Sequence, residues 1–215
     1  MEQTDIASNQ LSRRHWAQIV SDIFTPLLAP TYGIALAMWF TDLRAVNEIY
    51  RLIVTGIVAL ITAGIPLATV LVMMHKGRVS DMPISKRSER ITPMWVAAIC
   101  YILTSFILGI FGCPMWLRLF MISAGVATII ALIITIFWKI SAHTTGIGGL
   151  VALQFWCVTH GLSDVGSMAL LSSIILIAGL VATARMRLNR HSLSQVLAGL
   201  ALGFCVCFSI VSIFC

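Results

Sequence analysis

The sequence predicts an all-α fold, a polytopic transmembrane helical bundle of about seven membrane-spanning helices. Hydrophobic residues make up 59% of the 215 residues and charged residues only 10%, a composition far from that of soluble domains. The apolar residues also gather in long stretches, each near the roughly 20 residues that cross a bilayer as a helix. Both observations indicate an integral membrane protein.

Five stretches without a charged side chain are long enough to span a bilayer, namely residues 52–74, 94–112, 119–138, 166–183 and 196–215. Residues 23–41 form a further stretch that contains Pro26 and Pro30, and residues 147–162 form a short one that ends in His160. If the prolines break the first of these, the number of crossings falls to six. We expect a single domain over residues 1–215, with a mobile tail at 1–15 and a basic loop at 75–93.

Seven crossings place residues 75–93, 139–146 and 184–195 on one membrane face, here called face A. Eleven of the 14 Lys and Arg residues then lie on face A and three on the opposite face. The positive-inside rule would make face A cytoplasmic. Cations that bind a phosphate do not indicate membrane orientation, however, so face A can be the cytoplasmic face or the opposite one.

Two short segments at the ends of apolar stretches carry the candidate chemistry. One is Lys139-Ile140-Ser141-Ala142-His143, and the other contains Arg185, His191 and Gln195. Ionisable groups so close to hydrocarbon are costly, which makes them functional candidates. His15, His75 and His160 are interpreted as polar boundary residues, as a lone histidine near the end of a helix usually is.

These segments resemble two motifs of the type 2 phosphatidic acid phosphatase superfamily of membrane lipid phosphatases. The second motif of that family reads Pro-Ser-Gly-His, and Ile140-Ser141-Ala142-His143 stands in its place. The third reads Ser-Arg, five residues, His, three residues, Asp. Ala184-Arg185, His191 and Gln195 match it in spacing, as in a bacterial branch in which Gln replaces that Asp. The resemblance covers roughly the last 80 residues.

The first motif of the family, a Lys followed after six residues by Arg-Pro, has no counterpart in this chain. The segment from Lys86 to Pro93 contains Arg87 and Arg90 and lies on face A two spans earlier. We interpret it, together with Lys139, as a substitute set of phosphate ligands.

Phosphoryl transfer needs cations around the non-bridging oxygens, a nucleophile in line with the leaving oxygen, and an acid that protonates that oxygen. A neutral imidazole can be the nucleophile of a two-step route. The resemblance implies that His191 attacks and that His143 protonates the leaving group. It further implies that Arg185 clamps the phosphate and that Ser141 belongs to the phosphate cradle. Gln195 is expected to hold one imidazole tautomer of His191.

The sequence therefore predicts a lipid phosphate or lipid diphosphate phosphatase that forms a phosphohistidine and needs no metal or cofactor. A lipid phosphotransferase with an alcohol acceptor and a non-catalytic anionic-lipid binder are the alternatives. The expected partners are an anionic lipid phosphate substrate and membrane lipids, not nucleic acid, because the cations border a membrane face. The resemblance implies the bacterial inner membrane, with the active face periplasmic. The lipid and the oligomeric state stay open.

Overall fold

The computed structural model describes residues 14–78, 87–162 and 166–215, with the main chain alone for Arg87 and Ser88. Within these ranges the chain forms helices and no strand. A helix over residues 14–23 is followed by the elements α2 Ala29–Phe40, η1 Asp42–Ala45, α3 Glu48–Ala59, η2 Leu60–Gly64, α4 Ile65–His75, α5 Arg87–Ile110, α6 Met115–Phe137, α7 Ala142–Thr159, α8 Ser167–Arg187 and α9 Leu193–Phe214. The predicted all-helical bundle is confirmed.

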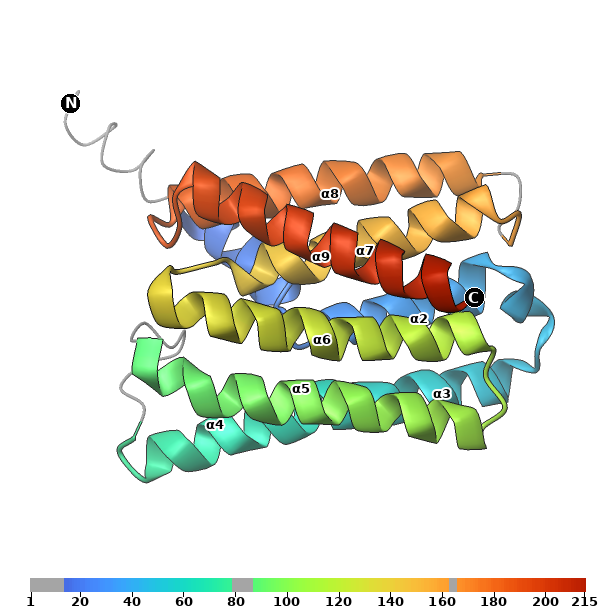
Figure 1. The fold of residues 1–215 in the computed structure, drawn as a ribbon, viewed down its shortest axis with the longest axis horizontal. Coiled ribbons are helices and arrows are strands. Elements are labelled where there is room, and N and C mark those ends of the chain that lie inside the picture. Colours follow the sequence, from blue (N-terminus) through green and yellow to red (C-terminus); the bar gives the residue numbers. More distant parts are fainter. Residues whose placement is uncertain (1–13, 79–86, 163–165) are drawn as a thin grey trace.

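The long helices lie side by side along one axis (Figure 1). α3 and α4 form one continuous rod joined by the π-helical turn η2, and α4 and η2 pack against α5 while α3 packs against α2. α6 lies between α5 and the group formed by α7, α8 and α9 (Figure 1). The C-terminal ends of α4, α6 and α8 lie at the same end of the bundle as the N-terminal ends of α5, α7 and α9 (Figure 1).

Within the described residues, five helical segments are long and apolar enough to cross a membrane: Glu48–His75, Glu89–Ile110, Met115–Phe137, Ser167–Arg187 and Leu193–Phe214. The predicted count of seven is not confirmed. The predicted span 23–41 is broken, since the chain leaves the helical conformation between residues 24 and 28, and Pro30 opens a helix α2 of only 12 residues. Proline at a first helical position is favourable, whereas inside a helix it removes a hydrogen bond.

Two predicted boundaries also need correction. In the tail predicted at 1–15, residues 1–13 lie outside the described residues, but residues 14 and 15 already belong to the helix over 14–23. In the loop predicted at 75–93, residues 79–86 lie outside the described residues, and α5 begins at Arg87. Glu89 lies in the first turn of α5, where a negative charge faces the positive end of the helix dipole.

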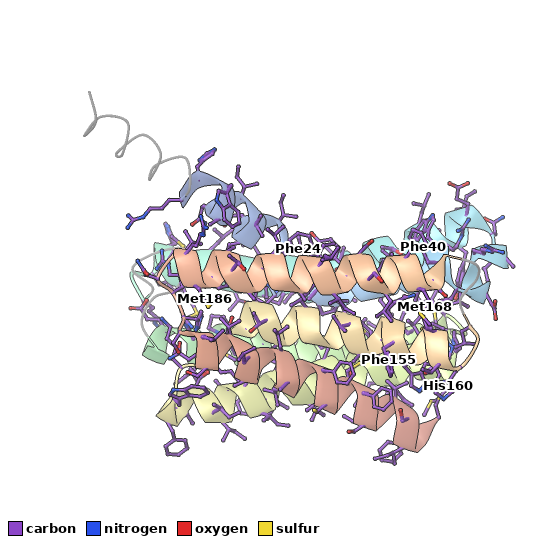
Figure 2. The ribbon with its side chains drawn as sticks, turned by 90° about the horizontal axis from the view of Figure 1, so that it is seen from above. Phe24, Phe40, Phe155, His160, Met168 and Met186 are labelled. Carbon is purple, nitrogen blue, oxygen red and sulfur yellow. The ribbon has the colours of Figure 1, made fainter. Side chains whose placement is uncertain are left out.

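The outer surface of the bundle is apolar. Ile110, Phe137 and Leu176 are 85%, 81% and 74% exposed. Water-facing surfaces rarely expose so many large apolar side chains next to one another. Figure 2 shows the side chains around the bundle, with Met186 and Met168 near opposite ends of α8. Such a surface suits a hydrocarbon environment.

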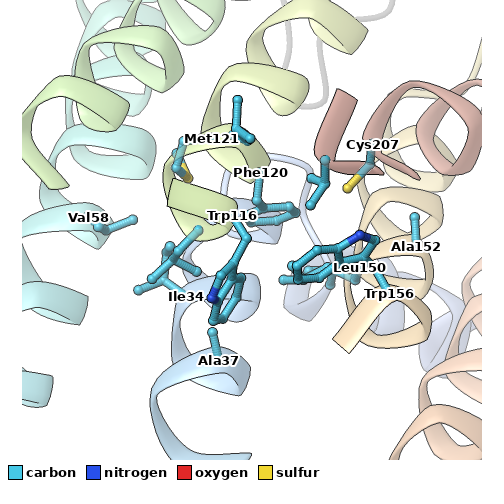
Figure 3. Close-up of a cluster of buried hydrophobic side chains, with 14 of the residues drawn as sticks. Ile34, Ala37, Val58, Trp116, Phe120, Met121, Leu150, Ala152, Trp156 and Cys207 are labelled. Atoms are coloured by element: carbon cyan, nitrogen blue, oxygen red, sulfur yellow. The ribbon is translucent and has the colours of Figure 1, made fainter. Parts of the chain in front are cut away.

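The core lies where α2, α6 and α7 meet. Ile34 from α2, Phe120 from α6 and Leu150 from α7 are all almost completely buried in one cluster (Figure 3). Trp116 and Trp156 pack their rings 6.0 Å apart in the same cluster. The shorter helices α2 and α7 are thereby held against α6 by apolar contacts.

Candidate active site

One cavity of about 720 Å³ opens at the end of the bundle where α5, α7 and α9 begin. Its polar and charged lining includes side chains from five separate segments, namely Ser21, Arg90, His143, Arg185 and His191. The rest of the wall is largely apolar and is built by residues of α4, α5, α6, α7 and α9, among them Val70, Ala97, Phe120, Gly149 and Cys207. Figure 3 shows Phe120 and Cys207 in the interior of the bundle. The cavity therefore joins a cationic mouth to an apolar interior.

A close helix crossing brings the two histidine segments together. A Cβ atom at Gly203 of α9 would collide with the main-chain oxygen of Thr145 in α7, and one at Gly199 would collide with Thr144. The main-chain amide of Ser141 also donates to the Gln195 carbonyl at 3.4 Å. Small residues at such a crossing let two backbones approach closely. The N-terminal turns of α7 and α9 are thus packed against each other.

His191 lies in the short link between α8 and α9 and is 7% exposed. Asn189 adopts a left-handed conformation with a φ of 52°, which ends α8. Ser192 then caps α9 in a capping box with Gln195. The sequence Asn189 to Gln195 therefore stops one helix, starts the next and presents His191 between them.

The hydrogen bonds of Gln195 define the tautomer of His191. Gln195 Oε1 accepts from the main-chain amide of Ser192 at 3.3 Å, so this atom must be the amide oxygen. The same oxygen lies 3.1 Å from His191 Nδ1. An oxygen acceptor requires a hydrogen on Nδ1, which leaves the lone pair of a neutral imidazole on Nε2.

The surroundings of His191 keep it neutral. Burial, and after it the positive charges of Arg185 and Lys139, lower the pKa of His191 to about 4, below its ordinary value of about 6.5. The hydrogen bond that His191 donates to Gln195 raises this pKa, and the charge of Arg90 lowers it further. Near neutral pH the Nε2 lone pair is therefore available.

His143 lies in the first turn of α7 and has the opposite tautomer. Its Nε2 lies 3.2 Å from the main-chain oxygen of Ser21 and 3.3 Å from the hydroxyl of the same residue. A carbonyl oxygen only accepts, so Nε2 of His143 bears the hydrogen. The Nε2 atom of His143 therefore bears a hydrogen, whereas the Nε2 atom of His191 has a free lone pair.

Arg185 is a buried guanidinium at the wall of the cavity. It is 4% exposed, and its Nη1 donates to the Ser21 hydroxyl at 2.6 Å. Its buried Nε has no hydrogen-bond partner in the part of the chain that the structure describes. A buried cation with unused donors is costly unless an anion completes it. The planar fork of arginine suits a phosphate in this position.

The remaining predicted site residues occupy different positions. Arg90 lines the cavity from α5, whereas the side chain of Arg87 lies outside the described residues. Lys139 and Gln195 do not line the cavity, although the charge of Lys139 and the amide of Gln195 act on His191. The Ser141 hydroxyl is fully buried and accepts from the Thr144 amide at 3.4 Å. It caps α7 and does not line the cavity, and its predicted place in a phosphate cradle stays a prediction.

The helix over residues 14–23 was not predicted from the sequence. Three of its polar residues, Gln18, Ser21 and Asp22, line the cavity, and Gln18 donates to the Asp22 carboxylate at 2.7 Å. Ser21 and Asp22 follow Gln18 after three and four residues. This spacing puts the three side chains on one helical face and could have predicted a polar helix here. Arg187 of α8 lies over the ring of Trp16 at 5.4 Å and so attaches this helix to α8.

The histidines interpreted as boundary residues stay away from the cavity. His160 stacks on Trp156 with ring centroids 4.2 Å apart and lies at the opposite end of the molecule from Met186 (Figure 2). His15 and His75 do not line the cavity either. Among the described residues, no group of three or more His, Cys, Asp or Glu side chains is placed to hold a metal ion.

Comparison of the chain with protein-family models, with curated proteins and with solved structures finds no match.

Proposed function

We propose that the protein is a membrane-embedded phosphatase of lipid phosphates or lipid diphosphates that acts through a phosphohistidine at His191. The observation that carries this proposal is the pair of histidines with opposite tautomers beside a buried arginine, at the mouth of an apolar cavity. The spacing of Arg185, His191 and Gln195, similar to the third motif of the phosphatidic acid phosphatase superfamily, supports it independently.

In the first step, His191 Nε2 attacks the terminal phosphorus, and the bond from phosphorus to the lipid oxygen breaks. The leaving oxygen takes a proton from His143, which carries a second proton as the imidazolium when the anionic phosphate is bound beside it. His143 is left as the neutral imidazole, and the lipid alcohol, or the lipid monophosphate from a diphosphate, departs. In the second step, His143 accepts a hydrogen from water as that water attacks the phosphohistidine. Inorganic phosphate leaves, and both imidazoles return to their starting forms.

The cations stabilise the phosphoryl group in this scheme. Arg185 faces two non-bridging oxygens with its planar fork, and Arg90 adds a charge from α5. Lys139 contributes its field at His191. Charge on the transferring group is spread over its equatorial oxygens, so fixed cations stabilise the transition state without having to reorganise.

The apolar interior of the cavity supports a lipid as substrate, because a hydrocarbon chain can occupy it while the phosphate lies at the cationic mouth. A polyprenyl diphosphate, a phosphatidic acid and a phosphorylated glycolipid all meet this description. We place the protein in the bacterial inner membrane, with the histidines at the periplasmic face, as the family resemblance implies.

The test is release of inorganic phosphate by purified protein in detergent from each of these three lipid classes, with excess EDTA present throughout. We expect release by the wild type and its loss in His191→Ala. Ser173→Ala on α8 is the matched control, because its exposed hydroxyl bonds only to its own helix at 2.8 Å. Transfer to an added alcohol without phosphate release would identify a phosphotransferase. Binding of the lipids without either product would leave a lipid carrier, and a requirement for magnesium would contradict the mechanism.

A further inference from the structure

Ser21 lies at the point where the two functional groups of the cavity mouth meet, although it is more than 160 residues from Arg185 in the chain. Its side chain is 3% exposed. Its hydroxyl accepts from Arg185 Nη1 at 2.6 Å and lies 3.3 Å from His143 Nε2. Its main-chain oxygen lies 3.2 Å from the same nitrogen.

The main-chain contact follows from the position of Ser21 near the end of its helix. The helix over residues 14–23 stops two residues later, so the Ser21 carbonyl is among the last four, which lack a helical donor. His143 supplies the missing donor. This bond keeps the hydrogen of His143 on Nε2.

The hydrogen of the Ser21 hydroxyl is not donated to any of the described side chains that contact it. A hydroxyl has two acceptor positions and one donor hydrogen. Arg185 Nη1 donates to Ser21 Oγ, and the single hydrogen on His143 Nε2 is shared between the main-chain oxygen and Oγ of Ser21, so neither neighbour accepts the Ser21 hydrogen. Among the described residues no acceptor receives the Ser21 hydrogen, and the residue lines the cavity.

A group that only accepts hydrogen bonds would complete this arrangement, and a phosphoryl group is of that kind. We propose that the Ser21 hydroxyl donates its hydrogen to a phosphoryl oxygen of the substrate, oriented for this by Arg185 and His143. This inference rests on the proposed function for its substrate, and it assigns the helix over residues 14–23 to the binding site. Ser21 is then a substrate-contacting residue that lies outside both motifs carrying the family resemblance.

The role predicts a defined pattern among three substitutions. Ser21→Ala removes the hydroxyl, and Ser21→Cys keeps nearly the same volume with a poor donor. Ser21→Thr keeps a hydroxyl. A hydrogen bond to a charged group corresponds to about a 10- to 100-fold effect, so we expect Ser21→Ala and Ser21→Cys to lower kcat/KM by that factor. Ser21→Thr should stay within about threefold of the wild type.

The experiment combines two readouts on each full-length variant in detergent: steady-state phosphate release and equilibrium binding of inorganic phosphate. Binding of phosphate should weaken in Ser21→Ala and Ser21→Cys and be restored in Ser21→Thr. Ser173→Ala should match the wild type in both readouts. The variants are compared at melting temperatures close to that of the wild type, and the cysteine variant replaces the alanine variant if the latter melts early.

Wild-type activity in Ser21→Ala or Ser21→Cys overturns the role of Ser21 and leaves the phosphatase proposal intact. An equal loss in Ser21→Thr also overturns it, because the hydroxyl would then not be the active group. If the wild type binds phosphate but hydrolyses none of the lipids, the phosphatase proposal fails, and the binding series alone decides the role of Ser21. A wild type that neither binds phosphate nor releases it overturns both.

Discussion

Gln195 Oε1 lies 3.1 Å from His191 Nδ1 and accepts from the Ser192 amide at the same time. The second bond identifies the atom as the amide oxygen, and the first therefore places the hydrogen of His191 on Nδ1. One glutamine thus starts helix α9 and orients the imidazole that precedes it. This relationship makes Nε2 of His191 the free nitrogen on which the proposed chemistry depends.

Substitution of Gln195 should therefore change the rate in a graded way. Gln195→Ala removes the group that orients the imidazole, and we expect a loss of about 10- to 100-fold in kcat, the usual size of such effects on a neighbouring ligand. Gln195→Asp should retain or raise activity and move the pH optimum upward, because a carboxylate raises the pKa of the histidine. Steady-state kinetics across a pH series measures both. Full activity in Gln195→Ala would contradict the orienting role.

The pKa of His191 has a consequence for stability. The folded protein holds this pKa near 4, whereas an unfolded histidine titrates near 6.5. Between these values the unfolded state binds more protons, so the contribution of His191 to the free energy of unfolding rises with pH across this window and falls as the solution is acidified. Melting temperatures of the wild type and His191→Gln should converge toward pH 4 relative to pH 7. A difference that is independent of pH would contradict the assigned shift.

If His143 is the general acid, the loss of rate in His143→Ala should depend on the leaving group of the substrate. A lipid alkoxide needs a proton as it departs, whereas nitrophenolate is stable without one. His143→Ala should therefore slow hydrolysis of a lipid phosphate by about 100-fold or more and slow that of p-nitrophenyl phosphate much less. Parallel assays on both substrates check this, with His15→Ala as the matched control. Equal losses on the two substrates would remove His143 from the acid role.

The crossing of α7 and α9 predicts a structural effect at Gly203. Gly203→Ala would place a Cβ against the Thr145 main-chain oxygen, and overpacking of this kind destabilises by about 1–3 kcal/mol. The matched control is Gly179→Ala in α8, where a Cβ would meet no atom within 4 Å. Thermal unfolding in detergent should show a lower melting temperature for the first variant only. Equal melting temperatures would show that the crossing is not tight.

The long charge-free stretches predicted most of the fold because hydropathy alone defines a membrane-length helix. Alternation of the helices also predicted that His143 and His191 lie at one end. The start of α7 was placed too late, at residue 147, because His143, Thr144 and Thr145 are polar. In the structure the hydroxyls of Thr144 and Thr145 both donate to the Ser141 carbonyl, so these residues are satisfied within the helix.

The positions of Ser21 and Ser141 in the structure could not be predicted from the local sequence pattern. Ser141 matches a motif position, yet its hydroxyl caps α7 because the helix begins at the next residue. Ser21 matches no motif and reaches Arg185 only because the helix over residues 14–23 packs against the end of α8. Such contacts depend on tertiary packing between segments far apart in the chain, which a single sequence does not display.

The most direct test of the central claim is the trapping of the covalent intermediate. The full-length protein in detergent is mixed with a substrate carrying ³²P in its terminal phosphate, quenched with alkali within milliseconds, and digested for peptide analysis, since phosphohistidine survives alkali and is lost in acid. The account predicts a labelled, acid-labile peptide that contains His191, present in the wild type, slower to form in His143→Ala and absent in His191→Ala. Phosphate release by His191→Ala at the wild-type rate, or a label on another residue, would contradict it.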